Sequence, residues 1–227
     1  MTEKVDTLEK IKEILETGSK FRISNVDGFN RCVYHICNLI KDSYNLYKNE
    51  SYSTSLFLSI TIIEEVGKTH MGSHVRDPEE IELDQQDMCE IEDDLKKSNS
   101  MESKTVTQSK KKGDPLYKHE MKHSAGLPFS VVMSDRIINS VGEKKLELLL
   151  EEAHKKGFMK RRNSALYCEC IDGNIAIPED IISKDEAKSF LLLAIESFDD
   201  NLVGYTDYSL DVSKYTDKIF NEIINNN

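Results

Sequence analysis

Three charged side chains interrupt an otherwise apolar stretch at residues 59–70, SITIIEEVGKTH. Helical geometry places Glu64, Glu65 and Lys68 with Thr61 on one narrow strip of a helix whose remaining surface is mostly apolar. Glu64 and Lys68 are four residues apart, in the order that favours an ion pair. Such a strip either faces solvent or lines a polar cavity, where buried charges need partners. The sequence leaves both interpretations open.

A second group of titratable residues lies at 117–123, YKHEMKH. His119 and His123 are four residues apart with Lys122 between them, so a helix would give them a basic, titratable face. RNA cleavage by 2′-hydroxyl attack needs a general base, a general acid and a cation near the phosphorane, and histidine and lysine supply all three. The alternative interpretation is an exposed, solvated segment beside a polar loop.

The densest basic cluster comprises Lys155, Lys156, Lys160, Arg161 and Arg162. It is the candidate for phosphate contact in a chain whose formal net charge is −11. Because an acidic protein repels nucleic acid as a whole, RNA would have to bind in a local basic pocket. The same cations also suit the C-terminal end of a solvated helix, which is the alternative interpretation.

Metal sites find little support in the spacing of potential ligands. Two E-x-x-H pairs end at His123 and His154, but a di-iron bundle needs two more glutamate-bearing helices and only one is evident. Cys168-x-Cys170 has no second cysteine pair to complete a zinc site. We therefore expect neither a metal nor a cofactor.

The cellular compartment follows from cysteines and apolar runs. The five cysteines form no regular framework, which favours reduced thiols in the cytoplasm. The N-terminal residues do not show the basic and then apolar pattern of a signal peptide. No apolar run approaches the ~18 residues that are needed to span a bilayer. We expect a cytoplasmic protein without a membrane partner.

Helical periodicity predicts the elements that must position these residues. We expect one all-α domain over residues 1–227, an antiparallel bundle in which Leu56, Ile60, Ile63 and Gly67 face the core. Residues 77–113 are acidic and then polar without apolar period, which predicts a long polar loop or excursion. Residues 160–178 contain the turn sequence Asp172-Gly173-Asn174 and predict a short non-helical insertion.

Residues 58–68, LSITIIEEVGK, resemble the AIEELGK signature of the AbiV family of abortive infection proteins. Residues 117–122 (YKHEMK), 160–167 (KRRNSALY) and 178–182 are similar to three further blocks of that family, in the same order, although the family's tryptophan is absent from the last. The resemblance implies a HEPN-like helical fold, a homodimer, and a role in antiphage defence by arresting growth or macromolecular synthesis. Many HEPN proteins are metal-independent ribonucleases with an Arg-x(4–6)-His motif, which is absent here; Arg31-x3-His35 is one residue short.

Two functions from different classes follow from these observations. The first is an endoribonuclease acting on RNA. The second is a non-enzymatic binding module, which either is triggered by a phage or host protein or blocks such a protein. For the enzyme we expect a catalytic group made of Glu64, Glu65, Lys68, His119 and Lys122. The expected nucleic-acid contacts are Lys156, Lys160, Arg161 and Arg162.

The arrangement of these residues can also be predicted. We expect Glu64, Glu65 and Lys68 to line a polar cleft with His119, Lys122 and one of Arg161 or Arg162. In this arrangement Glu64 holds Lys68, and the neighbouring carboxylate orients the His119 ring.

Overall fold

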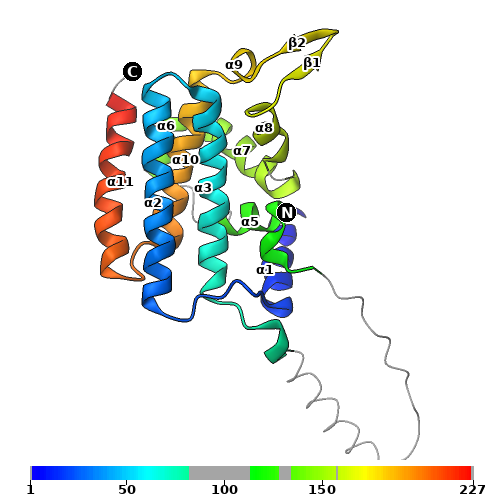
Figure 1. The fold of residues 1–227 in the computed structure, drawn as a ribbon, viewed down its shortest axis with the longest axis vertical. Coiled ribbons are helices and arrows are strands. Elements are labelled where there is room, and N and C mark those ends of the chain that lie inside the picture. The colour runs from blue at the N-terminus through cyan, green and yellow to red at the C-terminus, as the bar shows by residue number, and fades with distance from the viewer. Residues whose placement is uncertain (1, 82–112, 128–133, 157, 226–227) are drawn as a thin grey trace, which may run out of the picture.

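The computed structural model describes residues 2–81, 113–127, 134–156 and 158–225. Helices make up most of these residues, and the strands among them form one small hairpin (Figure 1). The prediction of an all-α fold is therefore confirmed. Most of the polar excursion predicted at 77–113 falls on residues 82–112, which lie outside the described residues.

Four long helices form the body of the molecule: α2 (Val26–Lys48), α3 (Tyr52–Gly72), α10 (Lys184–Leu202) and α11 (Asp207–Asn225) (Figure 1). Helix α3 packs against both α2 and α10, which explains why its sequence is apolar over most of its circumference. The residues predicted to face the core do so: Leu56, Ile60 and Ile63 are fully buried, and Gly67 is buried with them.

Shorter helices pack beside this body: α1 (Thr2–Thr17), the 3₁₀ turn η1 (Pro115–Tyr117), α5 (His119–Gly126), α6 (Asp135–Val141), α7 (Glu143–Lys156) and α8 (Met159–Ser164). Helix α5 contacts α3, α1 and α7. A second apolar cluster joins these elements: Ile14, Met71, Val75, Leu116, Met121 and Ala125. Helix α5 is therefore held from several sides against α3.

Two glycines allow α3 and α5 to approach backbone to backbone. A Cβ atom on Gly67 would lie 2.1 Å from the carbonyl oxygen of Lys122 and 2.6 Å from the amide nitrogen of Gly126. A Cβ atom on Gly126 would lie 2.4 Å from the carbonyl oxygen of Ile63. Side-chain groups of α10 complete the junction, because Ser197 Oγ and Asn201 Nδ2 both donate to the Gly126 carbonyl. The close approach sets the distance between side chains on α3 and on α5.

The non-helical insertion is a β-hairpin, but it begins later than the sequence predicts. Strands β1 (Glu169–Ile171) and β2 (Asn174–Ala176) pair antiparallel around a turn in which Asp172 and Gly173 both have positive φ. Residues 160–164, predicted as non-helical, belong to helix α8 instead. Lysine and arginine are good helix formers, and Arg161 forms ion pairs with Glu152 and Glu186 that hold this helix in place.

Candidate functional site

Glu64 is the centre of a cluster of basic side chains between α3, α5 and α8. Its side chain is only 4% exposed. The Oε1 atom lies 2.8 Å from His119 Nδ1 and 3.1 Å from His123 Nε2, while Oε2 accepts a hydrogen bond from Lys122 Nζ at 3.1 Å. Arg162 Nε lies 3.9 Å from Oε1. One buried carboxylate thus faces four nitrogen-bearing side chains.

The electrostatic state of Glu64 follows from these partners. Burial by itself raises the pKa of Glu64, but the polar contact with His123 and the charge and hydrogen bond of Lys122 outweigh it and lower the pKa to about 2. The carboxylate is therefore ionised at neutral pH and acts as a fixed hydrogen-bond acceptor.

His123 is the fully buried member of the cluster. Its Nδ1 atom accepts a 3.4 Å hydrogen bond from the backbone N–H of Phe158, so the proton of the neutral ring lies on Nε2, facing Glu64. The Nε2–Oε1 separation is short, but its orientation falls outside hydrogen-bond geometry. The pKa of His123 is lowered, mainly by burial and against the contact with Glu64, which raises it. His123 therefore supports Glu64 as a neutral ring packed against the Phe158 ring.

His119 is the most exposed member of the cluster, with 36% of its side chain accessible. Because Nδ1 donates to the ionised Glu64, a neutral His119 ring has its lone pair on Nε2. A carboxylate that fixes the tautomer of an accessible imidazole in this way is the arrangement that general bases use. The geometry therefore lets His119 accept a proton from a bound hydroxyl.

Arg162 brings a cation to the same site. Its guanidinium carbon lies 4.8 Å from the centre of the Phe57 ring, and its Nε has no hydrogen-bond partner among the described residues. Together with Lys122 it places two positive charges near Glu64 and His119, where they favour an anion.

The predicted pairing within α3 is wrong. Lys68 pairs with Glu65 at 3.5 Å, and its ammonium lies 4.3 Å from the centre of the Phe21 ring. Both oxygens of Glu64 contact groups of α5, a helix that the local spacing rule does not take into account. Glu64 itself, and not the neighbouring carboxylate of Glu65, orients His119.

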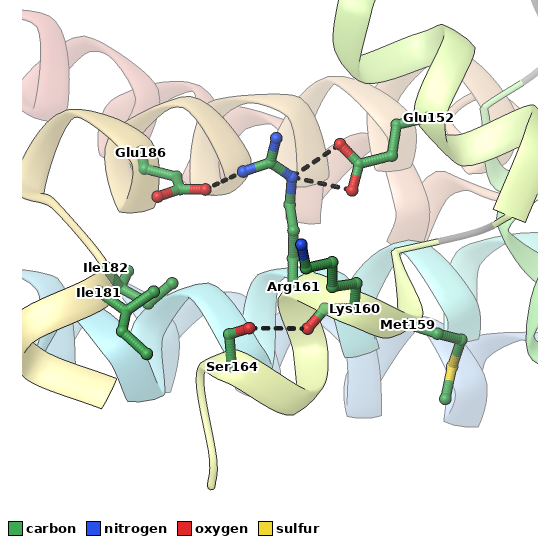
Figure 2. A pocket seen from close by; sticks show the side chains of 8 residues that line it. All are labelled: Glu152, Met159, Lys160, Arg161, Ser164, Ile181, Ile182 and Glu186. Atoms are coloured by element: carbon green, nitrogen blue, oxygen red, sulfur yellow. Dashed lines mark hydrogen bonds and ion pairs between the residues drawn. The ribbon is translucent and has the colours of Figure 1, made fainter. Parts of the chain in front are cut away.

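The predicted basic cluster is divided between two places. Arg162 contacts Glu64, whereas Arg161 pairs with Glu152 at 2.8 Å and with Glu186 in a separate pocket of about 600 Å³ (Figure 2). Lys160 lines the same pocket as Arg161. The side chain of Lys156, the remaining predicted contact, lies outside the described residues. Consecutive residues on a helix are 100° apart, which explains why Arg161 and Arg162 diverge.

One member of the Glu64 cluster was missing from the predicted site. His123 contacts Glu64, although His119 and Lys122 are the residues of segment 117–123 in the predicted catalytic group. The signal that could have identified it is the four-residue spacing from His119, which places both rings on one face of α5. Among the described residues, no group of three or more His, Cys, Asp or Glu side chains is arranged to hold a metal ion.

Comparison with known protein families identifies the chain. Residues 26–198 match the AbiV model of the HEPN domains. The chain belongs to the AbiV family. The match runs from the start of α2 into α10 and includes Glu64, His119, Lys122 and Arg162. No curated protein and no solved structure gave a match.

Family membership confirms the expected resemblance and the broad function. AbiV HEPN domains belong to abortive-infection proteins, so this chain is a phage defence protein. In the part of the chain that the structure describes, every helix is too short or too polar to cross a membrane.

Proposed function

We propose that this AbiV protein is a metal-independent endoribonuclease that arrests infected cells by cutting RNA. The observation that carries the proposal is the 2.8 Å contact between the buried Glu64 carboxylate and the accessible His119 ring. The carboxylate holds the ring with Nε2 available as a base, and two cations lie on the same carboxylate.

The first proton transfer can be followed through these residues. His119 Nε2 removes the proton of a ribose 2′-hydroxyl, whose oxygen attacks the adjacent phosphorus. The imidazolium that forms is stabilised by ionised Glu64, while Lys122 and Arg162 balance the added charge of the phosphorane. Expulsion of the 5′-oxygen then gives a 2′,3′-cyclic phosphate and a 5′-hydroxyl.

Expulsion of the 5′-oxygen needs a proton donor. His123 is fully buried, and Lys122 is 11% exposed and held by Glu64, which leaves His119 as the accessible titratable group of the cluster. A homodimer that apposes two clusters would supply a second His119 as the acid. The proposal therefore includes a dimer, and light scattering at micromolar concentration tests it through the particle mass.

A direct test incubates purified protein with total RNA in the presence of EDTA. Cleavage that persists in EDTA, leaves 2′,3′-cyclic phosphate ends and disappears in His119→Ala supports the proposal. A His119→Ala protein that is folded and cleaves like the wild type would refute the role of His119.

One observation favours a second function. The Glu64 cluster also joins α3, α5 and α8, and a buried charge network of this kind serves structure as well as chemistry. In this case the chain is a non-enzymatic binding module, which either is triggered by a phage or host protein or blocks such a protein. Inactivity on RNA, combined with growth arrest that survives His119→Ala, would select this function.

A further inference from the structure

The β-hairpin and its flanks expose large apolar side chains at a higher density along the chain than the rest of the described residues. Of the fifteen large hydrophobic side chains that are exposed among the described residues, five lie within residues 166–177: Leu166, Tyr167, Ile171, Ile175 and Ile177. Ile175 is the most exposed of all fifteen, at 71%. The hairpin projects from the helical body rather than packing on it (Figure 1). An apolar surface of this kind marks an interaction site.

The strand register shows that one face of the hairpin is apolar throughout. Cys170 lies opposite Ile175, and the same register places Cys168 opposite Ile177, so these four side chains share a face. All four are exposed. The other face is tied to the body, because Ser164 of α8 donates a hydrogen bond to Glu169. The opposite face is thus linked to α8 at Glu169, while the four apolar side chains stay exposed.

The strand edges are also available. In the described part of the chain β1 and β2 pair only with each other, which leaves the outer backbone edge of each strand without a strand partner. A two-stranded sheet is marginally stable by itself, and a third strand is the usual way in which such a sheet is completed. Addition of an extended segment from a partner would use both the edge and the apolar face.

The charge around the hairpin determines what kind of partner fits. Residues 163–183 contain Glu169, Asp172, Glu179 and Asp180, and no Lys, Arg or His. These carboxylates make the hairpin itself unfavourable for RNA, for anionic lipid surfaces and for the identical hairpin of a second copy. It favours a segment with basic side chains beside its apolar ones.

A pocket at the base of the hairpin offers a place for an anchoring side chain. Ser164, which bonds to β1, lines it, as do Ile181 and Ile182, which follow β2 by way of α9 (Pro178–Ile181) (Figure 2). Met159 adds a further apolar wall. Lys160 and Arg161 also line the pocket, and Glu152 and Glu186 there pair with Arg161 (Figure 2). Apolar anchors in such pockets provide much of the binding energy of protein interfaces.

We infer that the hairpin of residues 166–177 is a docking site for an extended, apolar and basic segment of a partner protein, which adds to it as a third strand. This site is separate from the Glu64 cluster and does not depend on ribonuclease activity.

The test uses a short synthetic peptide that alternates valine with lysine as the probe for the full chain. Two control peptides keep the length, one with glutamate in place of lysine and one with serine in place of valine. Binding is measured by fluorescence anisotropy, and the contact is mapped by alkylation of the thiols of Cys168 and Cys170. We expect the valine–lysine peptide to bind most tightly and to protect both thiols.

Matched variants locate the site. Ile175→Thr together with Ile177→Thr keeps β-branched residues at exposed positions, and should weaken binding about tenfold or more because apolar contact is lost. Leu210→Gln, an exposed leucine on α11, is the control and should leave binding unchanged. Asp172→Asn tests the charge requirement and should weaken binding more at low salt than at high salt.

Several results would overturn the inference. One is equal affinity for the serine–lysine peptide, which would show general attraction to an acidic protein. Another is unchanged binding in the double isoleucine variant, or thiols that stay reactive in the complex. A change of particle mass in the double variant, measured by light scattering, would assign the hairpin to a second copy of the chain instead.

Discussion

The Nδ1 atom of His119 lies 2.8 Å from Oε1 of Glu64, although 55 positions separate the two residues in the sequence. The contact exists because Gly67 and Gly126 let α5 approach α3 closely enough for a buried carboxylate to reach an accessible imidazole. This pair links the packing of the fold to the proposed chemistry, and five predictions follow from its surroundings.

The first prediction concerns the pH dependence of stability. The pKa of Glu64 in the folded protein is about 2, compared with an ordinary value of 4.5, so ionised Glu64 stabilises the fold above about pH 4.5. This contribution, on the order of 3 kcal/mol, should be lost as the pH falls from about 4.5 toward 2. Urea denaturation of wild type and Glu64→Gln across this range measures it.

The control for this experiment is Glu65→Gln, because Glu65 is more exposed and pairs with Lys68 on the surface of the same helix. Its stability should follow the wild-type pH profile. A Glu64→Gln protein with the same acid-dependent loss as the wild type would show that other carboxylates cause the effect.

The second prediction concerns the glycine contact between α3 and α5. In Gly67→Ala the new Cβ would meet backbone atoms of Lys122 and Gly126, which cannot move without moving α5. We expect a loss of about 1–3 kcal/mol in the free energy of unfolding, together with reduced RNA cleavage. Gly113→Ala is the matched control, since a Cβ there has no atom within 4 Å. Equal stability of the two variants would contradict the close approach.

These contacts show what the sequence could and could not predict. The periodicity of Leu56, Ile60 and Ile63 was sufficient to place α3 in the core, because burial of one helix face leaves a regular pattern. The partner of Glu64 was not predictable from its own helix. Spacing by four residues favoured Lys68, but a local rule contains no information about a helix that arrives from later in the chain.

The third prediction compares the two lysines. Lys122→Met removes the ammonium that Glu64 binds and should lower both RNA cleavage and stability. Lys68→Ala removes a more exposed pair with Glu65 and the contact with the Phe21 ring, so it should cost about 1 kcal/mol and leave cleavage intact. Initial rates per folded molecule, with stability from denaturation, distinguish them. Loss of cleavage in Lys68→Ala and not in Lys122→Met would show that Lys68, and not Lys122, contributes to catalysis.

The fourth prediction compares two neighbouring arginines. Arg162→Gln should reduce cleavage on the order of a hundredfold, as expected when one donor to a developing negative charge is lost. Arg161→Gln leaves Glu152 and Glu186 without their cation, so it should destabilise the fold but preserve the rate per folded molecule. Similar rate losses in both variants would indicate that RNA contacts the whole basic segment.

From the sequence, Arg161 and Arg162 were predicted to form one basic patch, because they are adjacent and both carry a positive charge. In the structure they lie on different faces of a short helix and contact different acids. Which face each one occupies depends on how α8 packs against α3, and no local pattern records that packing. The turn at Asp172 and Gly173, in contrast, was predictable, because its backbone conformation is determined by the residues of the turn itself.

The fifth prediction tests the central claim, which is that Glu64 and His119 form the catalytic pair of a metal-independent ribonuclease. Wild type, His119→Ala and Glu64→Gln are purified in parallel and incubated with total RNA in EDTA, and the RNA ends are analysed. We predict 2′,3′-cyclic phosphate ends from the wild type, none from folded His119→Ala, and strongly reduced cleavage by Glu64→Gln. Cleavage by folded His119→Ala at the wild-type rate would contradict the claim. So would a wild-type protein that arrests growth in cells but does not cleave RNA.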